Sequence, residues 1–216
     1  MLFSGLSIPH LIALLITLVI SIDFHEFGHA WSAVELGDDT PRLQGRLSLN
    51  PLAHLDPIGS LMMLIFGLGW GKPVIVAPWN FRNPRRDMML TAAAGPFMNL
   101  VLALVSAIPY RLGVFNFLYA QGGLVGSTLA PALDIFLVVF ISVNLGLMLF
   151  NLIPIGPLDG ANILRGLAPR EWDGFFAVMQ RYQLYIIMGL FLLSYMGGLS
   201  FIAVPQQWLF HLIVGQ

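Results

Sequence analysis

The sequence contains no cysteine and few charged residues, since only 10% of its 216 residues are Asp, Glu, Lys or Arg. Without cysteine there are no disulfides, no thiol nucleophile and no thiolate ligand, so histidine and carboxylate side chains remain the candidates for binding a metal. A soluble domain carries about 25% charged residues, so this composition is not typical of one. The net charge of −1 gives no reason to expect a nucleic-acid partner.

Hydrophobic residues are abundant instead, at 57% of the chain, and the mean hydropathy is +0.82. This composition is typical of an integral membrane protein whose surroundings are the lipid bilayer. The length allows about four to six hydrophobic passes of about 20 residues each, with short connections. We therefore expect a single membrane domain over residues 1–216 and no independent soluble domain.

The distribution of hydrophobic residues predicts an all-α polytopic protein with a bundle of four membrane-spanning helices. These helices are expected at about residues 8–36, 87–112, 129–150 and 182–204. Residues 58–70 are apolar but short and rich in glycine, so we expect a short or re-entrant helix there, and whether it crosses the membrane or dips into it is left open. Residues 206–214 are expected to lie along the membrane surface.

Residues 72–79 (KPVIVAPW) place β-branched residues between two prolines, which favours a short edge strand near the site. An edge strand can hold an extended peptide by strand addition, and residues 74–77 are the expected contact. The predicted architecture therefore includes one small β element beside the helices.

Residues 25–29 read His-Glu-Phe-Gly-His, which is the HExxH pattern of zinc hydrolases. On a helix, residues four apart share a face, so His25 and His29 can bind one zinc ion while Glu26 lies beside the open coordination position. His25 should lie about 24 Å along the helix from Pro9, within the far third of a hydrocarbon core about 30 Å thick. Two histidines and a glutamate at that depth are costly without a function, which disfavours a purely structural role.

A catalytic zinc site needs a third protein ligand and leaves the fourth position to water. Asp159 is the best carboxylate candidate, because it follows the third predicted helix in a loop that Pro154 and Pro157 must keep irregular. Taken alone, Asp159 is explained equally well as a loop cap; the two histidines favour ligation. The weaker candidates lie in polar surroundings or near the opposite membrane face; they are Asp56, Asp87, Asp134 and Glu171.

The basic residues predict the orientation. All Lys and Arg residues except Arg111 fall on the side where the first predicted helix ends and the second begins. The positive-inside rule makes that side cytoplasmic. We therefore expect a multi-pass protein of the cell membrane with its active site towards the cytoplasmic side.

Each of the other polar residues in the apolar stretches can have either a functional or a structural role. For Asp23, support of the metal site and a structural hydrogen bond are equally plausible. His54 is better explained as a residue that organises its loop than as one that reaches the metal. Asn99 and Asn144 are better explained as interhelical hydrogen-bond donors than as catalytic residues.

Three motifs in order, HEFGH at 25–29, AGPFMN at 94–99 and NLIPIGPLDG at 151–160, resemble the site-2 protease family of intramembrane zinc metalloproteases. Residues 45–60 (GRLSLNPLAHLDPIGS) and 71–74 (GKPV) are similar to its compact bacterial branch, which lacks a PDZ domain. The resemblance covers most of residues 21–165. It implies that one zinc ion is bound by His25, His29 and Asp159. It also implies that Glu26 is the catalytic base and that Asn151 assists the substrate or the oxyanion.

One position departs from the family pattern, because Gly156 stands where many relatives have proline. This change removes no ligand.

The expected function is that of a zinc endopeptidase that cuts transmembrane or membrane-proximal segments, as in regulated intramembrane proteolysis, with a transmembrane protein as its substrate. The alternatives are a non-proteolytic membrane metal-binding protein or transporter, and a zinc hydrolase of a lipid or another non-peptide amide. Glu26 favours an enzyme over a pure binding site, which has no need of a carboxylate beside the open metal position. The sequence predicts neither the substrate's identity nor the oligomeric state.

Overall fold

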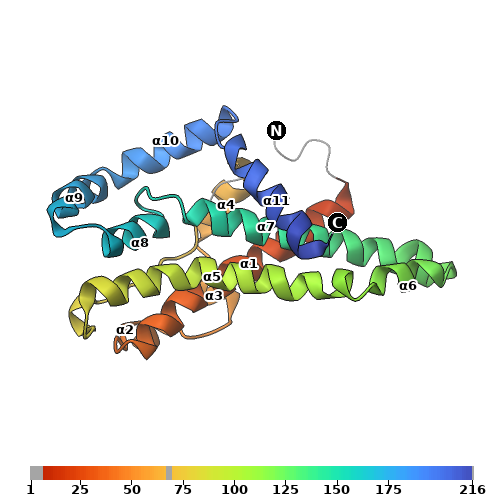
Figure 1. Ribbon diagram of the computed structural model, residues 1–216, viewed down its shortest axis with the longest axis horizontal. Coiled ribbons are helices and arrows are strands. Elements are labelled where there is room, and N and C mark those ends of the chain that lie inside the picture. The colour runs from red at the N-terminus through yellow and green to blue at the C-terminus, as the bar shows by residue number, and fades with distance from the viewer. Residues whose placement is uncertain (1–6, 67–69, 216) are drawn as a thin grey trace.

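The computed structural model describes residues 7–66 and 70–215, and it is mainly helical (Figure 1). Within these residues there is no β-strand. The helices, in chain order, are α1 (Ile8–Glu35), α2 (Thr40–Leu43), α3 (Pro51–His54), α4 (Pro57–Phe66), η1 (Pro78–Asn80), α5 (Pro84–Arg111), α6 (Val114–Ala120), η2 (Val125–Leu129), α7 (Ala130–Asn151), α8 (Asp159–Leu167), η3 (Arg170–Trp172), α9 (Asp173–Arg181), α10 (Gln183–Tyr195), η4 (Ser200–Ile202) and α11 (Ala203–Val214).

Three of these segments are long and apolar enough to cross a membrane: α1, α5, and Val125–Asn151, which joins η2 to α7. They lie side by side along the longest axis of the molecule, and each packs against the other two (Figure 1). This arrangement confirms three of the four predicted spans. The starts and ends of all three helices lie within four residues of the predicted positions.

Small and amide side chains hold the three long helices together. A methyl group built on Gly28 of α1 would lie 2.8 Å from the carbonyl oxygen of Ala94 in α5, so the two backbones are in contact there. Asn99 donates its Nδ2 hydrogens to the Ser21 carbonyl of α1, at 3.2 Å, and to Asn144 Oδ1 of α7, at 2.9 Å. The predicted role as an interhelical donor is confirmed for Asn99. Asn144 takes part in the same contact as the acceptor, because its own amide donates to the Phe140 carbonyl within α7.

The prediction of a continuous helix over residues 182–204 is wrong. The chain forms α10 and α11 instead, because Gly197 adopts a φ of 76° and ends α10. The Gly197 and Gly198 amides donate to the carbonyls of Ser194 and Leu193, which is the Schellman pattern of a helix C-terminus. The helical segments 170–181 and 183–195 are bent by 69° at their junction. If this pair is counted as one broken span, the described residues contain up to four helical segments long and apolar enough to cross a membrane.

The placement of residues 206–214 along the membrane surface stays a prediction. This segment belongs to α11, which packs against α7 and α5. Arg111, at the end of α5, donates hydrogen bonds to the carbonyls of Leu212 and Ile213 and so caps the C-terminus of α11. A basic side chain at one helix end therefore fixes another helix on the bundle.

The predicted β element is not seen. Residues 72–77, which we call the extended segment, form neither a helix nor a strand. The one β-bridge among the described residues joins Leu55 to Gly71, directly before this segment, beside a 2.6 Å hydrogen bond from the Lys72 amide to the His54 carbonyl. Pro73 and Pro78 lack the amide hydrogens that a ladder needs, so the pattern of β-branched residues did not produce a strand.

The short apolar stretch at 58–70 contributes to α4, which has ten residues. A helix of that length extends about 15 Å, half of a hydrocarbon core about 30 Å thick, so α4 alone does not cross. Residues 67–69 of the predicted segment lie outside the described part of the chain.

Asp38 fastens the extended segment to the end of α1. Its carboxylate accepts hydrogen bonds from the Ala77 amide (2.7 Å), from Asn80 Nδ2 (2.7 Å) and from the backbone and hydroxyl of Thr40. Burial raises the pKa of the Asp38 carboxyl, but the hydrogen bonds from Thr40, Ala77 and Asn80 lower it by more, so the pKa lies below its ordinary value.

Because Asp38 holds the segment at residues 72–77 through its carboxylate, we predict that acid weakens this attachment. Because the folded-state pKa of Asp38 is lowered, its stabilisation is fully present above the unfolded pKa of about 3.9 and is lost as the pH falls through the lower folded-state pKa. Hydrogen exchange at the Ala77 amide should therefore lose protection in that acid range. In Asp38→Asn the protection should be weak at every pH. Equal protection of the wild-type amide throughout the acid range would contradict this.

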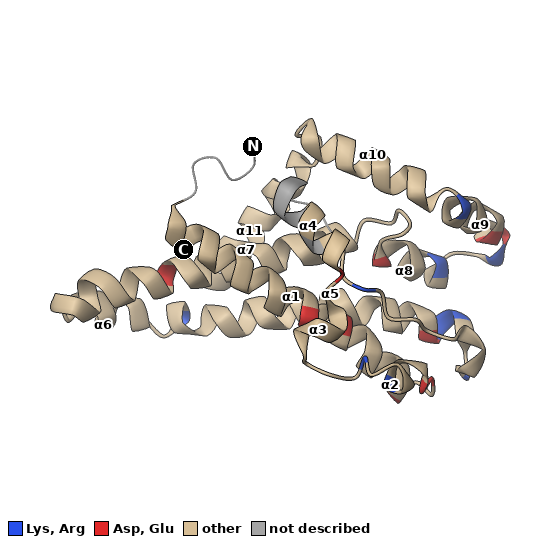
Figure 2. Cartoon of the chain, turned by 180° about the vertical axis from the view of Figure 1, so that it is seen from behind, with Lys and Arg blue, Asp and Glu red and all other residues tan. Residues whose placement is uncertain are grey.

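Charged residues gather at one end of the bundle. Figure 2 shows them around α2, α8 and α9, whereas the end near α6 carries few. The metal-site candidates of α1 lie towards the charged end, since His25 precedes Glu35, the last residue of α1, by ten positions, or about 15 Å.

Candidate metal centre

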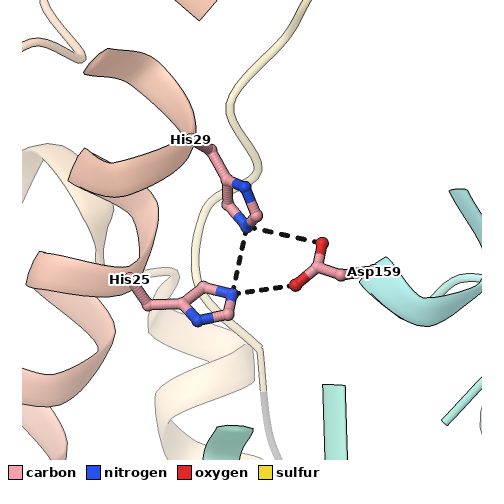
Figure 3. Close-up of side chains that lie close together, drawn as sticks. All are labelled: His25, His29 and Asp159. Carbon is pink, nitrogen blue, oxygen red and sulfur yellow. Dashed lines mark hydrogen bonds and ion pairs between the residues drawn. The ribbon is translucent and has the colours of Figure 1, made fainter. Parts of the chain in front are cut away.

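The three predicted ligands meet at one point. His25 and His29 lie one turn apart on α1, and Asp159 is the first residue of α8 (Figure 3). The Nε2 atoms of His25 and His29 lie 3.2 Å and 3.4 Å from the two carboxylate oxygens of Asp159, and 3.1 Å from each other. All three potential ligand atoms fall within 4.8 Å of one another. This is a geometry that one ion can bridge.

The hydrogen bonds behind the imidazoles determine which nitrogens face Asp159. His25 Nδ1 lies 2.7 Å from Asn99 Oδ1, and His29 Nδ1 lies 2.7 Å from the Thr91 carbonyl oxygen. Both partners are acceptors, because the Asn99 amide nitrogen is already engaged with Ser21 and Asn144. Each Nδ1 therefore carries a hydrogen, and each imidazole turns its Nε2 towards the other ligands.

The two Nε2 atoms and the carboxylate form a site that fits a zinc ion. Two histidines and one carboxylate are a common ligand set of catalytic zinc sites. Asp159 Oδ2 is buried and has no hydrogen-bond partner among the described residues. Burial raises the pKa of the Asp159 carboxyl, but His29 and His25 lower it by more, so the carboxyl is ionised, as ligation requires.

Helix α5 forms the floor of the site. A methyl group built on Gly95 would lie 2.4 Å from His29 Nε2 and 2.8 Å from His25 Cε1, so only glycine leaves room for both rings. Thr91, Gly95 and Asn99 are spaced four apart and therefore share the face of α5 that contacts the histidines. The motif at 94–99 was recognised in the sequence, but the contact of Thr91, Gly95 and Asn99 with the histidines was not predicted. The four-residue spacing of these three residues is the signal that indicates it.

Replacing Asn99 with leucine should weaken zinc binding by about 10- to 100-fold, because His25 would lose the acceptor that fixes its tautomer and ring orientation. The zinc affinity can be measured by competition with a chromogenic chelator. The exposed Asn116 of α6 provides the matched control, and Asn116→Leu should bind zinc as the wild type does. An unchanged affinity in Asn99→Leu would contradict the assigned role.

A tight turn brings Asp159 to the histidines. After α7 ends at Asn151, the chain folds back so closely that a methyl group on Gly160 would lie 2.4 Å from the carbonyl oxygens of Leu152 and Ile153. At the other end of α8, Arg85 of α5 donates hydrogen bonds to the carbonyls of Arg165 and Ala168. Both ends of the helix that begins with Asp159 are thus held.

Glu26 and Asn151 line the same cavity as the ligands. A methyl group built on Gly71 would lie 3.0 Å from Glu26 Oε1, so the extended segment passes directly beside this carboxylate. The Asn151 amide donates to the Leu147 carbonyl of its own helix at 3.0 Å. The structure thus places both predicted catalytic residues beside the metal centre, and their catalytic roles stay predictions.

Asp23 and His54 lie apart from the ligands. Both are buried, with Asp23 Oδ1 at 3.7 Å from His54 Nε2, and His54 Nε2 donates to the Ser48 carbonyl at 2.7 Å. His54 therefore organises the loop that precedes α3, as the sequence favoured.

The cavity at the metal centre has a volume of about 710 Å³. It runs between α1, α5 and α7, and it is closed by residues 70–76, by α8 and by the start of α11. Most of its wall is apolar, and the polar groups of the centre lie together at one end. A cavity of this size is typical of a binding site for a substrate rather than for an ion alone.

Comparison with known proteins agrees with this site. The chain is 38% identical over 178 residues to a Bacillus subtilis protein named "Putative zinc metalloprotease YwhC", which covers 82% of this chain and 79% of that protein. It is 32% identical over 200 residues to "Putative zinc metalloprotease Rip2" of Mycobacterium tuberculosis, covering 90% of this chain and 71% of the relative. No family model and no solved structure matches the chain.

The HExxH pair, the third ligand and the relatives together define a zinc metalloprotease whose long helices are apolar enough to cross a membrane. The chain belongs to the family that includes YwhC and Rip2, and this membership confirms the family resemblance of its motifs. Zinc is accordingly the metal of the site.

Proposed function

We propose that the protein is an intramembrane zinc endopeptidase, which hydrolyses peptide bonds in or near the transmembrane segments of other membrane proteins. The observation that carries this proposal is that two of the metal-site candidates lie on a helix long and apolar enough to cross a membrane. His25, Glu26 and His29 belong to α1, and the cavity continues from them to Leu18 and Leu14 of the same helix. An apolar polypeptide segment is the substrate that such a cavity fits.

Each residue of the site has its own role in the proposed hydrolysis. His25, His29 and Asp159 hold the zinc ion, which supplies a Lewis acid that polarises a carbonyl and makes water a stronger acid. Glu26 takes a proton from the attacking water and passes it to the amide nitrogen as the C–N bond breaks. One water molecule is consumed for each bond: its hydroxyl joins the carbonyl carbon and its proton joins the leaving amine.

We assign Asn151 the role of assisting the substrate. It lines the cavity, and its amide, which donates to the Leu147 carbonyl in the structure, would in the reaction donate to the oxygen on which negative charge develops. Removing such a donor costs about 3 kcal/mol in well-characterised hydrolases.

The charge distribution supports an orientation with the active site towards the cytoplasm of the cell. The end of the bundle that carries α2, α8 and α9 holds most basic residues (Figure 2), and basic residues mark the cytoplasmic side.

The experiment that tests this function uses the purified, zinc-loaded protein in liposomes with a model transmembrane peptide. We expect two fragments whose masses add up to that of the peptide plus one water, with the cut inside or beside the apolar segment. Zinc flux without fragments would instead favour the transporter alternative, and release of a lipid product would favour a non-peptide hydrolase. Either result without fragments overturns the proposal.

A further inference from the structure

A single glutamine side chain lines the cavity beside Ser142 and Gly146 of α7. Gln206 of α11 lines the cavity, and its Nε2 donates to the Ser142 carbonyl of α7 at 2.8 Å. A methyl group built on Gly146 would lie 3.5 Å from Gln206 Nε2, and the apolar residues Leu14, Leu18 and Ile202 line the same cavity. Gln206 Oε1 accepts no hydrogen bond from the described residues, so an acceptor is left over inside an apolar cavity.

The rise along α7 and along α1 gives two similar estimates of the length of the cavity between this region and the residues near the metal centre. Ser142 precedes Asn151 by nine positions on α7, which is about 13 Å. Leu18 and Leu14 precede His25 by seven and eleven positions on α1, which is about 10 to 16 Å. Leu14, Leu18 and Ser142 each precede, in their own helix, a residue that lines the cavity with the metal-site candidates. An extended chain advances about 3.3 to 3.6 Å per residue, so the interval corresponds to about four residues.

In the proposed reaction, a backbone amide of the substrate can donate a hydrogen bond to Gln206 Oε1. A transmembrane segment is helical, and its amides are bonded to its own carbonyls, so it must unwind before a peptide bond reaches the metal centre. Unwinding frees amide hydrogens in surroundings that offer no water. An amide hydrogen without an acceptor is costly there, and Gln206 Oε1 is an acceptor at the place where the unwound stretch ends.

Building on the proposed function, we propose that Gln206 is a specificity-determining residue. It accepts a hydrogen bond from a substrate backbone amide about four residues from the cut, on the side of the substrate that continues into the membrane. The preferred substrates are therefore transmembrane segments that unwind over at least this length and carry an amide hydrogen at its end. Segments with proline at that position are poor substrates, because proline has no amide hydrogen.

The test removes the two partners of this hydrogen bond in turn. A cleavable transmembrane peptide is made in versions in which one amide is replaced by an ester, which lacks the hydrogen, at each position within about six residues of the cut. We expect wild-type kcat/KM to fall about tenfold for the ester at one position near the fourth. Gln206→Met should cut the all-amide peptide about tenfold more slowly and lose nothing further with that ester.

The neighbouring Gln207 is exposed and supplies the matched control, since Gln207→Met should keep the wild-type sensitivity to the ester. Partial misfolding of a variant lowers the rates for amide and ester peptides by the same factor, so it cannot imitate the loss of ester sensitivity. Equal ester sensitivity of wild type and Gln206→Met at every position would overturn this inference and leave the endopeptidase activity intact. Failure of the wild type to cut the all-amide peptide would overturn the proposed function, and this inference with it.

Discussion

Replacing Glu26 with glutamine is expected to lower peptide hydrolysis by at least about 10²- to 10⁴-fold, while one zinc ion stays bound per chain. Glutamine has nearly the shape of glutamate, so the packing beside Gly71 is kept, but its amide cannot accept the proton of the attacking water. Zinc is retained because His25, His29 and Asp159 are unchanged. The measurement combines cleavage of a transmembrane peptide with zinc analysis of the same sample.

Glu35 provides the control for this change. It lies at the end of the same helix and is exposed, so Glu35→Gln should cleave at the wild-type rate. Wild-type turnover in Glu26→Gln would exclude Glu26 as the base. Loss of both zinc and turnover would show instead that Glu26 is needed to assemble the site.

Replacing Asp159 with alanine is expected to weaken zinc binding by more than about 100-fold, a larger loss than changes behind the ligands usually cause. One of three protein ligands would be missing, and the two imidazoles would face each other without the carboxylate. Turnover should fall with the bound zinc. The stabilisation of the fold by added zinc should also shrink, because a bound ligand stabilises the folded state in proportion to RT ln(1 + [L]/Kd).

The weaker zinc binding can be measured by chelator competition, and the smaller stabilisation by zinc can be measured by thermal unfolding with and without zinc. Asp39, exposed at the start of α2, supplies a carboxylate control, and Asp39→Ala should bind zinc as the wild type does. Tight zinc binding by Asp159→Ala would mean that another carboxylate completes the site.

The parts of the fold that the sequence predicted are those decided by local pattern. Apolar runs of about 20 residues located α1, α5 and α7, because every backbone polar group in a bilayer must be satisfied within its own helix. The four-residue spacing placed His25 and His29 together, and irregular backbone after α7 pointed to Asp159.

What the sequence did not predict depends on contacts between distant segments. Hydropathy favoured one helix over residues 182–204, but Gly197 can adopt a positive φ and ends α10 there. The residues at 72–77 had strand-like side chains, but no segment within residues 7–66 and 70–215 pairs with them in a ladder, and the Ala77 amide donates to Asp38 instead. The roles of Asn99 and Gly95 appeared only once α5 was placed against α1.

The measurement that tests the account most directly is peptide cleavage as a function of bound zinc. The protein is stripped with a chelator and then reloaded in steps, and both the zinc content and the rate of cutting a transmembrane peptide are followed. We expect the rate to rise in proportion to bound zinc and to stop rising at one ion per chain. Full cleavage by the zinc-free protein, or none by the fully loaded one, would contradict an endopeptidase built on His25, His29 and Asp159.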